Sequence, residues 1–245
     1  MIINRFKAFT LSEVLITLSI IGVVAAITMP LIINNYKKVE TVSRLKQTYT
    51  IISQAVNMSQ NENGPLESWD IPNATWGNAT YTQGKIFFDS YLKQYLRIIK
   101  DCKSRTKACW ADKYSLANKN NAPYFNASTN YTYGVVLNNG VIIGFWPQNN
   151  IVEVYIDLNG KKGPNIYGKD AFTIIIVKEA ISSNNLGQIN KAGVYMYGQG
   201  YSREKYTGQT SSNCSYCPCN KRQQGHWCGA LIMLDNWQIN SDYPW

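Results

Sequence analysis

The N-terminal part of the chain contains an uncharged, largely apolar run over residues 14–36. As a helix this run would rise about 34 Å, which covers the roughly 30 Å hydrocarbon core of a bilayer. Arg5 and Lys7 precede it, and Glu13 is the first acidic residue. Because basic residues favour the cytoplasmic side, the N-terminus is expected there and the rest of the chain outside. The pattern predicts one membrane-spanning helix with a carboxylate close to its start.

Beyond Pro30 the apolar positions recur every three or four residues, which predicts an amphipathic helix that continues the first segment. Pro30 is expected to kink this helix rather than end it, because neighbouring contacts can satisfy the freed carbonyl. Gly64 and Pro65 predict its C-terminus. The recurring apolar positions are Ile32, Tyr36, Val39, Val42, Leu45, Tyr49, Ile52 and Val56.

The remaining chain predicts a second helix and then a series of strands. Helical spacing continues over Lys85–Lys100, and strand patterns follow at residues 131–137, 141–146, 151–158 and 170–177. The first two strands form a hairpin with Asn138, Asn139 and Gly140 in its turn. Helices before strands indicate an α+β fold, with a long N-terminal helix on an antiparallel sheet of about four strands.

Six cysteines suit disulfide bonds in an oxidising compartment. Cys102 and Cys109 are expected to close a loop with Lys103, Arg105 and Lys107 on its rim. This loop is either a solvated loop or a contact for DNA or another subunit. Near the C-terminus, two disulfides are favoured over a zinc site that would include His226. The pairing is either Cys214–Cys217 with Cys219–Cys228, or Cys214–Cys219 with Cys217–Cys228.

A calcium loop is conceivable between the last two predicted strands, where four side chains supply oxygen atoms. The segment lacks regular EF-hand spacing, and Lys161 and Lys162 oppose a divalent cation. It is therefore interpreted chiefly as a turn with Asx hydrogen bonds, and no other cofactor is expected. The candidate calcium ligands are Asp157, Asn159, Asn165 and Asp170.

Charge and motifs constrain the function further. The formal net charge is +9, without any run of five or six Lys/Arg, which permits weak contact with DNA or an anionic surface. No G-x-S-x-G, H-E-x-x-H or P-loop motif is present. With one histidine and cysteines that are expected to be paired, no nucleophile and base can be assigned, so the chain is not expected to be an enzyme.

The stretch "KAFTLSEVLITLSIIGVVAAITMP", Lys7–Pro30, resembles the N-terminus of type IV pilins and of the pseudopilins of type II secretion. The shared motif is a short basic leader, a small residue, Phe-Thr-Leu-x-Glu and an apolar run. The resemblance implies that prepilin peptidase cuts between Ala8 and Phe9 and that the new amine of Phe9 is methylated. Ala8 replaces the usual glycine of the family, and it is small enough for processing to survive.

The resemblance also implies assembly through the N-terminal helix. Gly22 and Pro30 match the helix-loosening residues of the family, and Glu13 matches its glutamate. That glutamate pairs with the N-terminal amine of a neighbouring subunit and so sets the register of a filament. An unpaired charge in hydrocarbon is the penalty for wrong placement.

These observations predict a structural subunit, more readily a minor one, of a type IV pilus or type II secretion pseudopilus. Residues 1–8 would form the leader, 9–33 the transmembrane and filament-core helix, 34–60 the amphipathic stem and 61–245 the extracytoplasmic pilin-like domain. Expected partners are other subunits, prepilin peptidase, the inner-membrane assembly platform and the lipid bilayer. The subunit is expected first in the inner membrane, with its N-terminus in the cytoplasm, and then in the filament.

Two alternatives remain open from the sequence. One is a competence-type pilus subunit that contacts DNA. The other is an extracytoplasmic binding or enzymatic domain behind an ordinary signal peptide or signal anchor.

Overall fold

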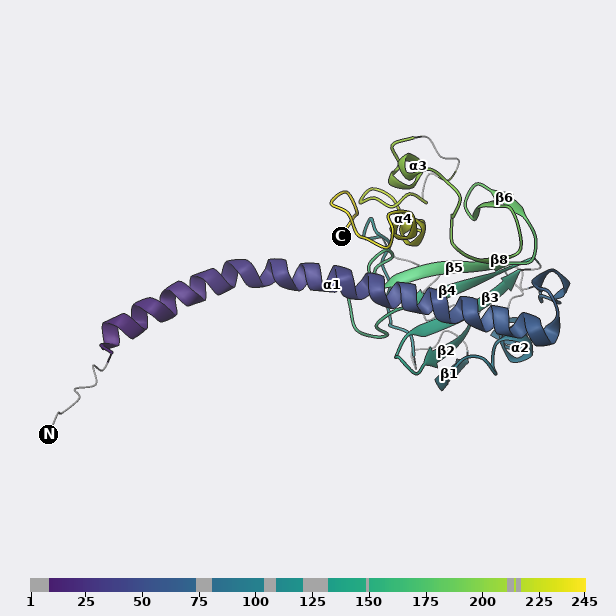
Figure 1. Ribbon diagram of the computed structural model, residues 1–245, viewed down its shortest axis with the longest axis horizontal. Coiled ribbons are helices and arrows are strands. Elements are labelled where there is room, and N and C mark those ends of the chain that lie inside the picture. Colours follow the sequence, from purple (N-terminus) through teal and green to yellow (C-terminus); the bar gives the residue numbers. More distant parts are fainter. Residues whose placement is uncertain are drawn as a thin grey trace. The chain divides into compact units, whose positions relative to one another are not determined.

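A computed structural model describes residues 9–73, 81–103, 109–120, 132–148, 150–210, 214 and 217–245. The elements follow one another as a long helix, a short helix, a sheet and two short helices near the C-terminus (Figure 1). The chain divides into two compact units, Met1–Glu40 and Thr41–Trp245, and each is described on its own. The order of elements agrees with the predicted α+β fold.

Helix α1 (Leu11–Asn63) contains both the apolar run and the amphipathic segment that follows it. It continues through Pro30, as expected for a proline inside a spanning helix. Its apolar side chains in the first unit are exposed, whereas Leu45 and Val56 in the second unit are buried. Gly64 follows with φ +80°, the left-handed conformation that commonly closes a helix. The sequence pattern therefore predicted both the length of this helix and its end.

One antiparallel sheet forms the centre of the second unit, and within the described residues its strand order is β1-β2-β3-β4-β5-β8. The expected strands correspond to β2–β5, which pair in sequence order. Strands β1 and β8 add one strand at each edge, beyond the about four predicted. The bounds are β1 (Ile98–Lys103), β2 (Tyr133–Leu137), β3 (Ile142–Gln148), β4 (Ile151–Asp157), β5 (Ala171–Val177) and β8 (Gly193–Met196), with β6 (Ile181–Ser183) and β7 (Gly187–Ile189) as a separate pair.

The second helix is shorter than predicted. Helix α2 covers Tyr81–Tyr91, so the prediction of a helix as far as Lys100 was wrong beyond Tyr91. Leu92 and Leu96 are buried in the core through a series of turns rather than a helix. The chain then enters β1, where pairing with β2 decides its conformation. The helical spacing of apolar residues therefore reflected burial alone.

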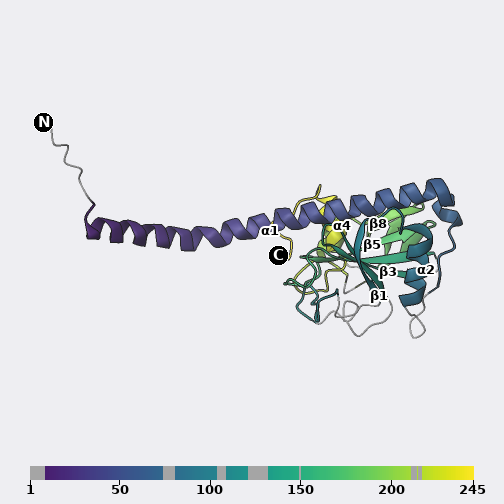
Figure 2. The same ribbon diagram turned by 90° about the horizontal axis from the view of Figure 1, so that it is seen from below.

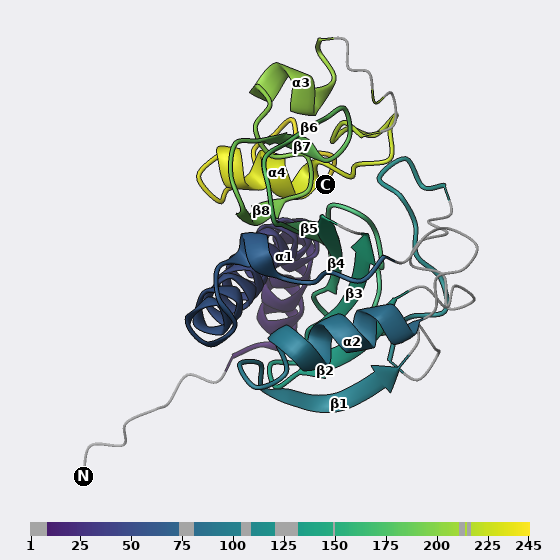
Figure 3. The same cartoon turned by 90° about the vertical axis from the view of Figure 1, so that its right-hand side faces the viewer.

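In the second unit, α1 lies along one face of the sheet, as Figures 2 and 3 show from two directions, and the core fills the space between them. Helix α2 packs beside it, with Phe88 against Tyr133 and Phe145. Two further short helices, α3 (Arg203–Thr207) and α4 (Cys228–Leu234), lie in the C-terminal part, and a 3-10 turn covers Leu66–Ser68.

A second apolar cluster joins β3 and β4 to the segment after Cys109. It contains Trp110, Tyr114, Trp146 and Tyr155, and all four side chains are buried. This packing brings Tyr114 to the end of β4, where the β4–β5 loop begins.

Candidate functional site

The N-terminus of α1 contains a reciprocal capping arrangement. The backbone N–H and the hydroxyl of Thr10 both donate to Oε2 of Glu13, each at 2.8 Å. The backbone N–H of Glu13 in turn lies 3.2 Å from the Thr10 hydroxyl oxygen and donates to it. This is the capping box that a T-x-x-E sequence can form at the start of a helix. Glu13 thus has a partner within its own chain.

The apolar segment after Glu13 buries almost nothing in the isolated chain. Phe9 is 85% exposed, and a typical apolar side chain such as Ile20 is 59% exposed. A Cβ placed on Gly22 would meet no atom within 4 Å. The helix is long and apolar enough to cross a membrane. Lipid or the helices of other subunits are the surroundings that would cover such a surface.

The other predicted N-terminal residues divide between two parts of the chain. Pro30 lies inside α1, whereas Lys7 and Ala8 lie outside the described residues. The cut between Ala8 and Phe9 therefore stays a prediction.

Near the start of the amphipathic segment, the β4–β5 loop connects distant parts of the second unit. The hydroxyl of Thr41 in α1 donates to the carbonyl of Lys169 at 2.9 Å. The N–H of Ser115 donates to the carbonyl of Asn165 at 2.8 Å. The loop is therefore hydrogen-bonded both to α1 at the start of the second unit and to the segment around Ser115.

Asp157 occupies the start of this loop and is fully buried. One of its carboxylate oxygens accepts the backbone N–H groups of Asn159 and Gly160 at 3.0 and 2.8 Å. The other oxygen accepts the hydroxyl of Tyr114. Burial raises the pKa of Asp157 to about 7, although these hydrogen bonds oppose the rise.

Asp170 ends the loop in the same way. Its oxygens accept the N–H groups of Ile166 at 2.6 Å and Asn165 at 2.7 Å, together with the side-chain amide of Asn159 at 3.1 Å. Burial raises its pKa as well. The side chains of three of the four candidate calcium ligands, Asp157, Asn159 and Asp170, thus take part in turn hydrogen bonds, and Asn165 takes part through its backbone N–H.

This loop is a set of Asx-type turns. Each carboxylate accepts three hydrogen bonds, which leaves few lone pairs for a calcium ion. Within the described residues, no group of three His, Cys, Asp or Glu side chains could hold a metal ion. Calcium binding stays a prediction, and the donors present fit it poorly.

The cysteines form three disulfides in the structure. Cys102 pairs with Cys109, Cys214 with Cys217, and Cys219 with Cys228. The last two pairs match one of the two arrangements that the sequence left open. The Lys103 side chain, Arg105 and Lys107 of the predicted basic loop lie outside the described residues.

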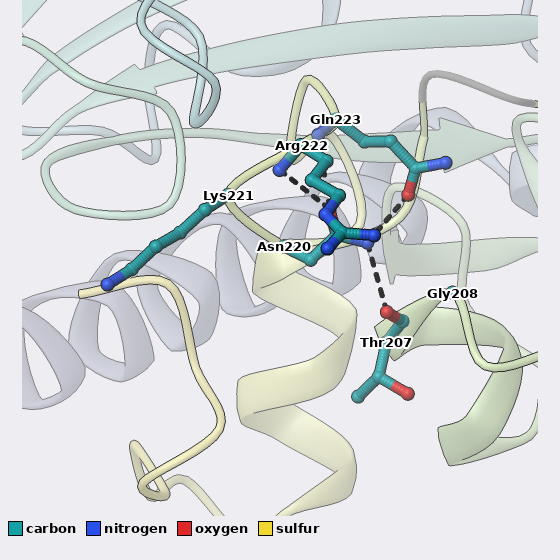
Figure 4. Close-up of a pocket in the computed structure, with 6 residues that line it drawn as sticks. All are labelled: Thr207, Gly208, Asn220, Lys221, Arg222 and Gln223. Carbon is teal, nitrogen blue, oxygen red and sulfur yellow. Dashed lines mark hydrogen bonds between the residues drawn. The ribbon is translucent and has the colours of Figure 1, made fainter.

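A small depression near the last disulfide is lined by residues of α3 and of the loop before α4 (Figure 4). The side-chain amide of Asn220 donates to the Thr207 carbonyl at 3.0 Å and to Gln223 at 2.6 Å. These bonds hold the wall together and leave Lys221 and Arg222 as the charged groups of the lining. The lining supplies no nucleophile or acid–base pair, and it consists of Thr207, Gly208, Asn220, Lys221, Arg222 and Gln223.

Sequence reasoning missed two partners of the important carboxylates. Thr10 could have been found, because the T-x-x-E spacing before an apolar run is a local signal. Tyr114 could not, since it lies 43 positions from Asp157 in the sequence and only the packing of the second apolar cluster brings them together.

Comparison with known families adds two findings to this geometry. Residues 31–245 match a family of unknown function (DUF6613). The chain belongs to this family. Residues 3–29 match the prokaryotic N-terminal methylation motif. No curated relative and no solved structure matches the chain.

The methylation motif, the apolar helix and the α+β fold together make this a type IV pilin-like protein. Proteins of this type are structural rather than catalytic, which agrees with the absence of a recognisable catalytic motif in the sequence.

Proposed function

We propose that this chain is a minor structural subunit of a type IV pilus or a type II secretion pseudopilus. In this proposal prepilin peptidase cuts between Ala8 and Phe9, and the Phe9 amine is methylated. The subunit is first anchored in the inner membrane, with its N-terminus in the cytoplasm, and then enters a filament through its N-terminal helix. The exposed apolar surface of α1 before Thr41 is the observation that carries the proposal.

The hydrogen bonds of Glu13 support a role in assembly. Thr10 occupies Oε2 of the carboxylate, and among the described residues no donor reaches Oε1. A carboxylate can accept several hydrogen bonds, so Oε1 has room for the amine of a neighbouring subunit. In the bilayer, Thr10 would then supply the hydrogen bonds to the Glu13 carboxylate. In the filament, the amine of the neighbouring subunit would add a positively charged partner.

The composition of the second unit supports the minor role. Three disulfides and the two short C-terminal helices make the second unit elaborate, which suits a subunit at a tip or one that starts assembly. The proposed partners are other subunits, the peptidase, the inner-membrane assembly platform and the bilayer.

Mass analysis of the mature N-terminus tests the processing step. A chain that begins at methylated Phe9 is the expected result. A chain that begins near Ala26 or Ile27 would show an ordinary signal peptide and would overturn the proposal.

Substitution of Glu13 tests the assembly step. The variant Glu13→Ala should insert and be cut normally but should fail to enter filaments, because the amine of the neighbour loses its partner. Glu67→Ala removes an exposed carboxylate in the second unit and is the matched control, which should assemble normally. Normal incorporation of the Glu13 variant, measured in sheared filament fractions, would contradict the proposal.

A further inference from the structure

Three segments of the second unit that are far apart in the sequence lie together, and each of them carries a lysine. The lysines are Lys119 in the segment that packs on the outer face of the sheet, Lys169 in the β4–β5 loop and Lys221 in the loop before α4. Burial lowers the pKa of Lys169, Asp170 opposes this effect, and the positive charges of Lys221 and Lys119 lower the pKa further. Repulsion of this kind falls off with distance, so it agrees with a position of Lys119 and Lys221 near Lys169.

The segments that carry these lysines are fixed to one another. The N–H of Ala117 donates to the carbonyl of Gln224 at 3.0 Å, which joins the first segment to the third. The ring of Tyr167 stacks on His226 with centroids 4.7 Å apart, which joins the second to the third. The lysine cluster is therefore a built feature of the fold rather than a chance approach of mobile side chains.

The neighbouring carboxylates do not neutralise this lysine cluster. Asp170 is 4% exposed, and its oxygens accept three hydrogen bonds within the loop. In the described part of the chain, none of the three lysines forms an ion pair with a carboxylate. Lys119 and Lys221 are exposed and Lys169 is half-buried, so the cluster presents positive charge to its surroundings.

The lysine cluster also lies at a defined end of the second unit. The carbonyl of Lys169 accepts the hydroxyl of Thr41, the first residue of that unit. Only residues 37–40 separate Thr41 from the uncharged run that ends at Tyr36. Even fully extended, these residues span about 14 Å. Covalent connectivity therefore keeps this end of the unit near the surface of a bilayer that holds the run, whatever angle the chain takes there.

We propose that Lys119, Lys169 and Lys221 bind the anionic lipid headgroups on the outer face of the membrane in which the subunit is anchored. The inference rests on the proposed membrane anchoring and adds a contact that would hold the second unit against the bilayer before assembly. The Trp245 ring, whose centroid is 5.6 Å from the Lys169 ammonium, supports a lipid partner. Tryptophan is enriched at the headgroup level of membranes.

The test uses the full chain in lipid nanodiscs, with lysine acetylation rates measured by mass spectrometry. One set of discs contains phosphatidylcholine alone, and the other contains phosphatidylcholine mixed with phosphatidylglycerol. Lys119, Lys169 and Lys221 should be acetylated several-fold more slowly in the anionic discs, because headgroup phosphates cover their amines. High salt should remove the difference.

Lys191 is the internal control for this measurement. Lys191 lies two residues before Gly193, and Gly193 pairs with Val177 at the C-terminal end of β5. Asp170 lies at the opposite end of β5. The acetylation rate of Lys191 should be the same in both lipids.

Two double variants with equal charge loss sharpen the test. Each basic residue near an anionic bilayer contributes a factor of about five to binding, so K119Q/K221Q should weaken binding to the anionic bilayer about 25-fold. Lys169, which remains in this variant, should then be acetylated at the same rate in both lipids. The matched control is K93Q/K191Q, which should retain the slow acetylation of Lys169 in anionic discs.

The outcomes separate this inference from the proposed function. A chain that does not enter nanodiscs would contradict membrane anchoring and with it the contact. If the chain enters nanodiscs but the three lysines are acetylated at equal rates in both lipids, the lipid contact alone is overturned. The same holds if both double variants lose the slow acetylation of Lys169 in anionic discs to an equal extent. Duplex DNA added to discs of phosphatidylcholine alone tests the other partner. If DNA slows acetylation of the three lysines and phosphatidylglycerol does not, the lysine cluster binds nucleic acid and the proposal is overturned.

Discussion

Asp157→Asn should change how the stability of the second unit depends on pH. The Asp157 carboxylate is fully buried and accepts hydrogen bonds from Tyr114, Asn159 and Gly160. An asparagine has nearly the same shape, and its carbonyl oxygen can still accept the two backbone N–H groups. The substitution therefore removes the titrating group while it leaves the turn in place.

The size of the effect follows from the pKa of the carboxyl group. Burial raises the pKa of Asp157 from 3.8 to about 7. A group whose pKa is raised in the folded state stabilises the fold fully when the pH is below its unfolded-state pKa. This stabilisation is lost as the pH rises through the folded-state pKa. Between about pH 5 and about pH 8, the free energy of unfolding should fall by about 2.7 kcal/mol through this group alone.

His226 acts in the opposite direction. Burial lowers its pKa from 6.5 to about 4, so protonation of the unfolded chain destabilises the fold as the pH falls below 6.5. At about pH 5 this costs about 2 kcal/mol relative to neutral pH. The two effects largely cancel in the wild type. Only the difference between the wild type and Asp157→Asn isolates the carboxyl group.

Equilibrium urea unfolding of the full chain in detergent micelles, with the disulfides intact and tryptophan fluorescence as the signal, measures this difference. Between about pH 5 and about pH 8, the wild type should lose about 2.7 kcal/mol more than the Asp157→Asn variant. His226→Gln is a matched control, because it removes the opposing term and should enlarge the loss. Equal pH dependence of the wild type and Asp157→Asn would refute the reasoning.

Three further changes should have local effects of predictable size. Thr10→Val breaks the capping box with Glu13, so amide exchange in the first turn of α1, followed by NMR, should accelerate about fivefold, whereas Thr10→Ser should leave it unchanged. Gly168→Ala places a Cβ 2.7 Å from the Cys228 sulfur at φ +85°, so urea unfolding should show a loss of about 2–3 kcal/mol; an unchanged midpoint would contradict this packing. Replacement of Cys219 and Cys228 by alanine opens a short loop and should lower the free energy of unfolding by about 2–3 kcal/mol in the same assay. Replacement of Cys214 and Cys217, which close a shorter loop, should lower it less. The opposite order of the two losses would contradict the prediction.

Local sequence patterns were sufficient for much of the fold. The apolar run, its continuation through Pro30 and the end of α1 near Gly64 depend on neighbours in the chain, so periodicity and helix signals predict them. The four central strands alternate or are continuously apolar and are bounded by turn residues, which is also local information. The edge strand β1 was missed because the start of its sequence "IIKDCK" continues the helical spacing of the preceding segment, and only pairing with β2 makes it a strand.

The sequence itself determined the N-terminal motif and the need of α1 for an apolar environment. Both depend only on residues at fixed spacing along one helix. Tertiary structure decided how the four C-terminal cysteines pair and that Tyr114 meets the Asp157 carboxylate. It also brought the segments that carry Lys119 and Lys221 together beside the β4–β5 loop. These contacts join segments far apart in the chain. They depend on how the faces of the sheet are covered, and no local pattern encodes that arrangement.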